Sequence, residues 1–333
     1  MDAAELAREL GGLALALEQA GANIDYRRIS LAQYLSEWRA HSSSAQTLYN
    51  PQLMRYPRSL AVTWETTLDQ LGAQEVALLR LFAHFAPDPI PLFVLETEGA
   101  ESAFQGAVSL VQQDTAKVAG TGQGSGDALA TLANYSMVKW DTQEDAVTVH
   151  RVVQQIVRTR LPAAERKQWI AVSLQLLDWA RPRKPSDVRT WPQWNLLRPH
   201  VAFAVAQADR EGITAPTSKL MSELGVLLHA KALSAEAEPL MRRALAIDES
   251  CFGAEHPKVA TELHNLAQLL QATNRLAEAE PLMRRAVIAI LNFTRKTGHE
   301  HPHLSQALGN YAGLLAEMGL PEEEVQARLN SLL

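Results

Sequence analysis

The sequence predicts an all-α protein with one small β-hairpin, whose C-terminal part is a solenoid of helical repeats. The strongest observation is a ten-residue string, AEAEPLMRRA, that occurs at residues 235–244 and again at 277–286, an offset of 42 residues. An identical string at a fixed offset indicates an internal repeat. Only two short segments, 136–141 and 146–149, have the character of strands, and the turn between them predicts a hairpin. The apolar residues of the string follow the i, i+3, i+4, i+7 spacing of one helical face, as in Ala237, Leu240, Met241 and Ala244.

Each copy of the string is predicted to be the second helix of a helix–turn–helix unit. A small residue of the first helix precedes a small residue of the second by 12 positions: Gly225 before Ala237, and Ala267 before Ala279. Small residues on facing helices allow a close approach, so these pairs mark the expected helix crossings. The first helices of the three units are expected at 219–231, 258–272 and 303–317.

The repeat spacing resembles the tetratricopeptide repeat, in the longer variety known from kinesin light chains. Residues 255–257 and 300–302, both Glu-His-Pro, look like the loop between repeats of that variety. The resemblance covers residues 217–333 and implies a protein or peptide partner. Asn265 and Asn310 occupy equivalent places on the first helices, on the face that lines the concave groove of such folds. Each can hold the backbone of a bound peptide or bond to the neighbouring helix, and both roles stay open.

The turns and the end of the array give further expectations. Asn274 and Gly319 end their first helices at matching places and are expected to have positive φ, which Asn and Gly tolerate. Ala232, their counterpart in the first repeat, is expected to avoid it. Helix 321–332 is expected to cap the array, because Glu324 stands where a small packing residue would admit a further repeat.

Three regions precede the repeats. Residues 1–56 are expected to hold a helix at 2–21, divided near Gly11-Gly12, and one at 31–40. Residues 57–161 are expected to form a winged helix, and residues 162–216 a helical connector. The helices expected in the winged helix are 59–71, 73–86, 101–113, 127–134 and a closing helix from 150.

The order of these regions resembles the C-terminal part of bacterial NB-ARC-type signal-transduction ATPases of the STAND class. Residues 11–21, GGLALALEQAG, resemble their helical subdomain, although Ala14 replaces the proline that lies against adenine in the family. His150 matches the histidine of the family's Met-His-Asp triplet, which contacts the β-phosphate of ADP, whereas Val149 and Arg151 depart from it. The resemblance implies ADP or ATP with magnesium as cofactors of an intact family member.

The phosphate-binding motif of such ATPases does not occur in this sequence. No G-x-x-x-x-G-K-[ST] string is present, and the glycine-rich residues 120–126 are interpreted as a loop. No G-x-S-x-G motif of a serine hydrolase is present either. We therefore expect no enzyme activity and no cofactor in this chain, which is expected to begin where the phosphate-binding domain of the family ends.

Charge and composition limit the remaining partners. A net charge of −6 gives no general attraction to nucleic acids or to anionic membranes. Helix 127–134 has no Lys or Arg, which disfavours DNA binding by a winged helix. The single cysteine, Cys251, fits a reducing compartment, and without a signal peptide or a membrane-spanning run the protein is expected in the cytoplasm. The alternating histidines 299, 301 and 303 are interpreted as a repeat loop in preference to a metal site.

The sequence thus predicts a non-catalytic regulatory and protein-interaction module of a STAND-type signalling protein, whose repeats sense a ligand or partner. One alternative is a part of an intact nucleotide-binding ATPase switch, with its phosphate-binding domain outside this chain. A less favoured alternative is a winged-helix transcription regulator.

Overall fold

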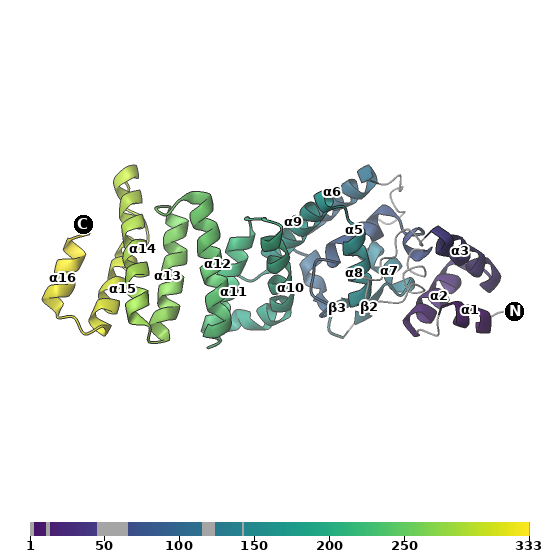
Figure 1. Cartoon of the computed structure of the whole chain (residues 1–333), viewed down its shortest axis with the longest axis horizontal. Coiled ribbons are helices and arrows are strands. Elements are labelled where there is room, and N and C mark those ends of the chain that lie inside the picture. The colour runs from purple at the N-terminus through teal and green to yellow at the C-terminus, as the bar shows by residue number, and fades with distance from the viewer. Residues whose placement is uncertain (1–2, 11–13, 45–65, 115–123, 142, 333) are drawn as a thin grey trace. The chain divides into compact units, whose positions relative to one another are not determined.

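The computed structural model describes residues 3–10, 14–44, 66–114, 124–141 and 143–332. Nearly all of the elements in these ranges are helices, and the β-structure is one small sheet (Figure 1). The predicted fold class is therefore confirmed. The chain divides into two compact units, Met1–Arg181 and Pro182–Leu333, and each is described by itself.

The first unit opens with three helices, α1 (Ala3–Glu9), α2 (Ala14–Arg27) and α3 (Leu31–Ser44). Helices α1 and α2 lie on the two sides of the predicted division near Gly11-Gly12, which itself lies outside the described residues, and both α2 and α3 run further than expected. Arg27 on α2 donates to both carboxylate oxygens of Glu37 on α3, at 2.7 and 3.2 Å. Buried Gln19 donates from Nε2 to the carbonyl of Ser136, at 2.6 Å. That bond ties α2 to the later part of the same unit.

The remainder of the first unit is a set of helices around a three-stranded antiparallel sheet in the order β1-β3-β2. The predicted hairpin forms from β2 and β3, with Val138 opposite Val149. A third strand, β1, was missed, because a strand of two residues, the second of them a proline, is too short to show an alternating pattern. The elements of this part are α5 (Ala73–Phe82), β1 (Ile90–Pro91), η2 (Leu92–Leu95), α6 (Ala100–Asp114), α7 (Ser125–Asn134), β2 (Val138–Asp141), β3 (Ala146–Val149), α8 (Arg151–Arg160) and α9 (Ala163–Ala180).

The expected helices 101–113 and 127–134 are confirmed as α6 and α7, whereas α5 ends four residues before the expected 86. Of the expected helix 59–71, residues 59–65 lie outside the described residues, and 66–68 are helical. Residues 120–123 of the glycine-rich loop also lie outside them.

The C-terminal end of α5 and the residues just after it are held by two side chains from α8, the first helix after the sheet. Gln154 on α8 donates from Nε2 to the carbonyls of Phe82 and Phe85, at 2.9 and 3.2 Å. Arg158, one turn further along α8, donates to the carbonyl of Ala83. Burial lowers the pKa of Arg158 to about 10. These bonds satisfy carbonyls that a helix end leaves unpaired, so α8 is locked onto α5 by polar contacts as well as by its apolar face.

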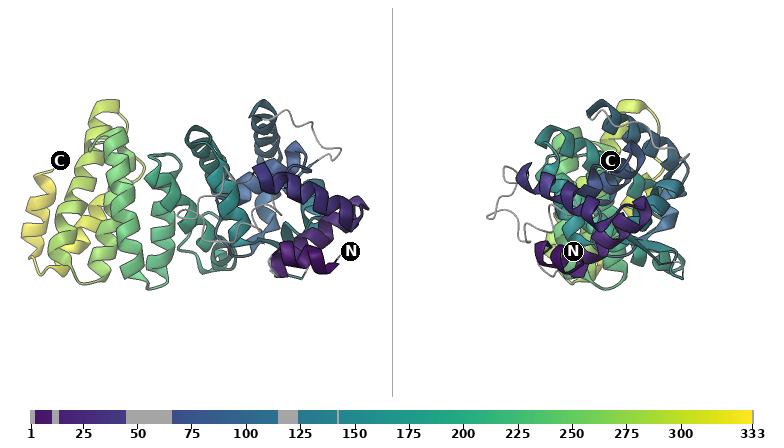
Figure 2. Two further views of the ribbon diagram at one scale, coloured as in Figure 1. Left: turned by 45° about the vertical axis from the view of Figure 1, so that its right-hand side comes forward. Right: turned by 90° about the vertical axis from the view of Figure 1, so that its right-hand side faces the viewer.

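The second unit begins with η3 (Val188–Thr190) and α10 (Trp191–Arg210) and continues as the predicted repeat array. Figures 1 and 2 show α11 to α15 lying side by side, each packed against the next in chain order. The predicted connector is divided, because α9 packs on α5 and α6 of the first unit and α10 packs on α11 of the second. The array consists of α11 (Thr217–Ala230), α12 (Ser234–Phe252), α13 (Pro257–Ala272), α14 (Leu276–Thr297), α15 (Leu304–Glu317) and α16 (Glu322–Asn330).

The small residues lie at the helix crossings, as predicted. A Cβ atom at Gly225 would lie 2.7 Å from Cγ of Met241, closer than two carbons can approach. Ala237, Ala267 and Ala279 are completely buried. The 12-residue rule therefore identified a close helix crossing in the first repeat, and the burial of Ala267 and Ala279 agrees with it in the second.

The turns between the two helices of each repeat have one shared geometry. Asn274 and Gly319 have φ of 59° and 85°, which confirms the prediction. Ala232 has φ of 61°, so the expectation that it avoids this region was wrong. In the first repeat the N–H of Leu233 donates to the carbonyl of Leu228 at 2.8 Å, the closing bond that the other two turns also make. That bond, with a usual net value of about 0.5–1.5 kcal/mol, offsets part of the roughly 1–2 kcal/mol that a Cβ costs in the left-handed region.

Helix α16 covers the last repeat in the predicted way. Val325 is 6% exposed and faces α15, whereas Glu322, Glu323 and Glu324 are exposed. The outer side of α16 is therefore polar.

Candidate interaction groove

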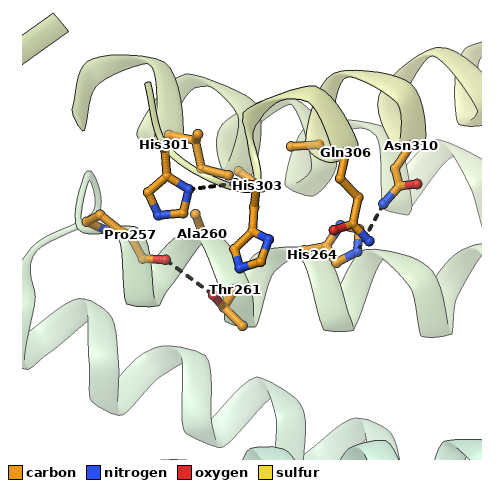
Figure 3. Close-up of a pocket in the computed structure, with 11 residues that line it drawn as sticks. Pro257, Ala260, Thr261, His264, His301, His303, Gln306 and Asn310 are labelled. Carbon is orange, nitrogen blue, oxygen red and sulfur yellow. Dashed lines mark hydrogen bonds between the residues drawn. The ribbon is translucent and has the colours of Figure 1, made fainter. Parts of the chain in front are cut away.

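The first helices of the second and third repeats present matching stripes of residues on one side of the array. On α13 and on α15 the spacing of these residues is i, i+3, i+4, i+7, so each stripe lies along one helical face. Together with residues of α14 and the loop before α15, the stripes line a pocket of about 190 Å³ (Figure 3). The lining residues are Pro257, Ala260, Thr261 and His264 on α13, Ala286 and Ile290 on α14, and His301, His303, Gln306, Ala307 and Asn310.

The floor of this pocket is apolar and its rim is polar but uncharged. Ala260, Ala286 and Ala307 are almost completely buried, and with Ile290 they form the floor. The polar groups are amides, a hydroxyl and three imidazoles, and no Asp, Glu, Lys or Arg lines the pocket. A small apolar hollow with a few polar groups at its edge is the usual form of a ligand site.

Asn310, one of the two predicted ligand-binding residues, contacts the neighbouring first helix. Its Nδ2 lies 3.2 Å from Nε2 of His264 on α13, as Figure 3 shows. Asn265 makes the counterpart contact one repeat earlier, where its Nδ2 donates to Oγ of Ser222 at 3.4 Å. The sequence left two roles open for these asparagines, and in the structure both of them bond to the neighbouring helix. Both are half-buried, and the peptide-holding role stays a prediction.

The hydrogen bonds define the protonation states of two imidazoles in the pocket. An amide nitrogen only donates, so Nε2 of His264 accepts from Asn310 and the ring proton sits on Nδ1, 3.3 Å from the sulfur of Met283. Nδ1 of His301 accepts the backbone N–H of His303 at 3.2 Å, which places the ring proton of His301 on Nε2. Burial, and next the nearby His303, lower the pKa of both His264 and His301. Both rings are therefore neutral at neutral pH.

His150, the predicted phosphate contact, lies in the other unit and has a structural partner there. It is exposed at the start of α8, and its Nδ1 accepts the backbone N–H of Val152 at 3.2 Å. His256 caps α13 with an identical contact to Lys258, also at 3.2 Å. Burial, and next Arg151, lower the pKa of His150. Contact with a nucleotide phosphate stays a prediction for this residue.

The alternating histidines of the last repeat loop have no metal cluster around them among the described residues. The N–H of His301 donates to Oγ1 of Thr294 at 3.2 Å, and its ring meets Phe293 edge to face. His301 therefore has a defined place in the loop.

The junction between the first two repeats has the same architecture but opposite chemistry, which sequence reasoning missed. The second junction, between the second and third repeats, is the one that contains the pocket. At the positions that Ile290 and Ala307 have in the second junction, the first junction has Asp248 and Glu262. Glu262 is 6% exposed. Its pKa is raised to about 7, first by burial and then by Asp248 and Glu223, against a hydrogen bond from Ser222. Aligning the repeats at offsets of 42 and 45 residues would have found these exchanges.

The fold and the groove define a helical protein that carries tetratricopeptide repeats. Residues 216–287 match the tetratricopeptide repeat family, so the prediction of tetratricopeptide repeats is confirmed for this part of the chain. Residues 66–166 match a family described as a domain of unknown function (DUF7779), and these residues cover the sheet, its helices and the start of α9. None of the described helices has both the length and the apolar character needed to cross a membrane.

No curated protein matches the sequence. Among solved structures, the chain is similar to BtubC (BKLC) from P. vanneervenii, with 16% sequence identity and a TM-score of 0.37. That similarity covers 54% of this chain and 77% of the other.

Proposed function

We propose that this chain is a non-catalytic regulatory and protein-interaction module, whose repeats hold an extended peptide segment of a partner protein in the groove between α13 and α15. The observation that carries this proposal is the uncharged pocket between two matching helical stripes. Repeats of this kind generally mediate contacts between proteins, and a groove along their first helices is the surface that a peptide can follow.

The chemistry of the pocket selects the kind of segment. An aliphatic side chain fits a floor of alanines and Ile290, and a charged side chain would lose its hydration there without gaining a partner. The amides of Gln306 and Asn310 at the rim can bond to a peptide backbone. The N–H at Nε2 of His301 offers a further donor. We therefore propose a segment with an aliphatic residue between two uncharged neighbours.

The finer proposal places the module in a STAND-type signalling protein of the cytoplasm. The order of the chain's parts supports it: three N-terminal helices, a small domain with a three-stranded sheet, and then repeats. In that setting the repeats sense a partner, and a separate phosphate-binding domain handles ADP or ATP with magnesium. His150 would contact the nucleotide phosphate only in that context. We propose no nucleic-acid or membrane partner, because the net charge is −6.

Peptide display on the full chain tests the main proposal. Selection from a random peptide library at about pH 7.5 is expected to enrich peptides with a recurring aliphatic position. Their affinity should fall for Ala307→Glu, which copies the acidic first junction into the pocket, and stay unchanged for the exposed control Ala235→Glu. Enriched peptides that bind both variants equally would place the site elsewhere, and the absence of enrichment would contradict the proposal.

Calorimetry with Mg-ATP tests the non-catalytic part. The chain is expected to neither bind nor hydrolyse ATP, because the loop that supplies most phosphate contacts does not occur in the sequence. Binding in the micromolar range would contradict this.

A further inference from the structure

We propose that the groove between α13 and α15 is controlled by pH, because protonation of His264 and His301 makes an uncharged pocket cationic and removes the acceptors that hold the amide of Asn310 on α15 and the backbone N–H of His303 just before α15. This inference rests on the proposed function, since it concerns the regulation of the same site. It does not follow from the tetratricopeptide fold, because Ser222 replaces His264 in the first junction.

The first step is the geometry of the two accepting nitrogens. Nε2 of His264 receives the amide of Asn310, which joins α13 to α15. Nδ1 of His301 receives the backbone N–H of His303, which directly precedes α15. A protonated imidazole has two N–H donors and no acceptor. In the protonated state the amide of Asn310 would have to rotate so that its Oδ1 accepts from His264, and the contact between Nδ1 of His301 and the N–H of His303 would have to break.

The second step is the surroundings of the two rings. The lining residues of α14 are Ala286 and Ile290, and those that α13 adds around His264 are Pro257, Ala260 and Thr261. The residues of α15 are Gln306, Ala307 and Asn310, and the one further titratable group that lines the pocket is His303. No carboxylate among the lining residues can compensate the new charge. Burial and His303 both favour the neutral rings, which agrees with the lowered pKa of each.

The third step is the contrast with the first junction. Glu262 and Asp248 are buried there, and acid pH neutralises a buried carboxylate instead of charging it. Lowering the pH should therefore relax the second junction while the first stays closed. We therefore expect the opening at low pH only at the second junction, which contains the pocket.

The tautomers and the titration can be measured on the full chain labelled with ¹⁵N-histidine. Long-range ¹H–¹⁵N spectra are expected to show the proton of His264 on Nδ1 and that of His301 on Nε2. Both rings should titrate below the ordinary histidine value of about 6.5. The opposite tautomer at both rings would overturn the proposal.

Hydrogen exchange measures the opening. Protection of backbone amides at the start of α15 is expected to fall about tenfold between about pH 7.5 and pH 5.5, after correction for intrinsic rates. The double variant His264→Gln/His301→Asn keeps a side-chain acceptor at each place and cannot be protonated, so its protection should not change with pH. The control His299→Asn, an exposed histidine outside the pocket, should behave as the wild type. If the double variant fails to fold, each single variant should remove part of the change.

A wild-type protection that is independent of pH, or a change that persists in the double variant, would overturn the proposal. These readouts need no peptide. Their failure is thus distinguishable from a failure of the proposed function, which is measured by peptide binding at neutral pH.

Discussion

Asn310 and His264 face each other across two neighbouring repeats, with Nδ2 of the amide 3.2 Å from Nε2 of the imidazole. Asn265 and Ser222 repeat the relationship one unit earlier. The same asparagine position thus joins successive first helices while it borders the groove. A ligand that formed hydrogen bonds to these amides would therefore compete with the contact between neighbouring first helices.

Asn310→Ala is therefore expected to raise the pKa of His264, because the lost bond favours the neutral ring. The free energy of unfolding should fall by about 0.5–1.5 kcal/mol, the usual net value of one such bond. Histidine NMR titration and urea unfolding measure the two effects. Asn330→Ala on the exposed face of α16 is the control, and an unchanged His264 pKa would show that the contact does not form in solution.

Glu262→Gln is expected to change how stability depends on pH. The folded-state pKa of Glu262 is raised to about 7 by burial. The contribution of Glu262 to the free energy of unfolding is therefore complete below the pKa that this carboxyl has in the unfolded chain. It is lost as the pH rises through about 7. The variant should therefore gain stability relative to the wild type at about pH 8 compared with about pH 5, by at most about 3 kcal/mol at 1.4 kcal/mol per pKa unit. Urea midpoints at the two pH values measure this, with exposed Glu236→Gln as the control. An equal change in the urea midpoint of Glu262→Gln at both pH values would contradict this prediction.

His150 is expected to act as a helix cap that another capping residue can replace. His150→Ala should lower the stability of the first unit by about 1 kcal/mol, because the N–H of Val152 loses its acceptor. His150→Asn should restore most of this loss, since asparagine is a preferred cap. Urea unfolding followed by circular dichroism compares the two. Equal stability of the alanine variant and the wild type would mean that the cap contributes nothing.

Ala279→Leu is expected to destabilise the array more than Ala235→Leu. Ala279 is completely buried in a helix crossing, where added methylenes cost about 1–3 kcal/mol. Ala235 lies exposed in the first turn of α12. Because both positions belong to the repeated string, the comparison separates burial from local sequence. Coinciding urea midpoints would refute the packing explanation.

Deletion of residues 321–333 is expected to cause self-association. The deletion uncovers the side of α15 that α16 covers, including Leu315, which is now completely buried. An uncovered apolar face at the end of a solenoid promotes association. Light scattering measures the mass, and thermal unfolding should show a lower melting temperature. A monomer with an unchanged melting temperature would mean that α16 is not a cap.

The repeat architecture could be read from local patterns along the chain. The duplicated string, the 12-residue spacing of small residues and the helical stripes each lie within one or two adjacent helices. Apolar periodicity decides such features, because it sets which face of a helix is buried. The polar outer side of α16 was predictable for the same reason.

Other features depend on contacts between distant segments. Strand β1 exists because Ile90 lies opposite Val147, and neither residue alone indicates a strand. Ala232 adopts a positive φ because the closing bond of its turn fixes the backbone. The partners of the asparagines come from helices more than 40 residues away. Only the stacking of the helices decides which side chains meet there, because it alone brings these distant segments into contact.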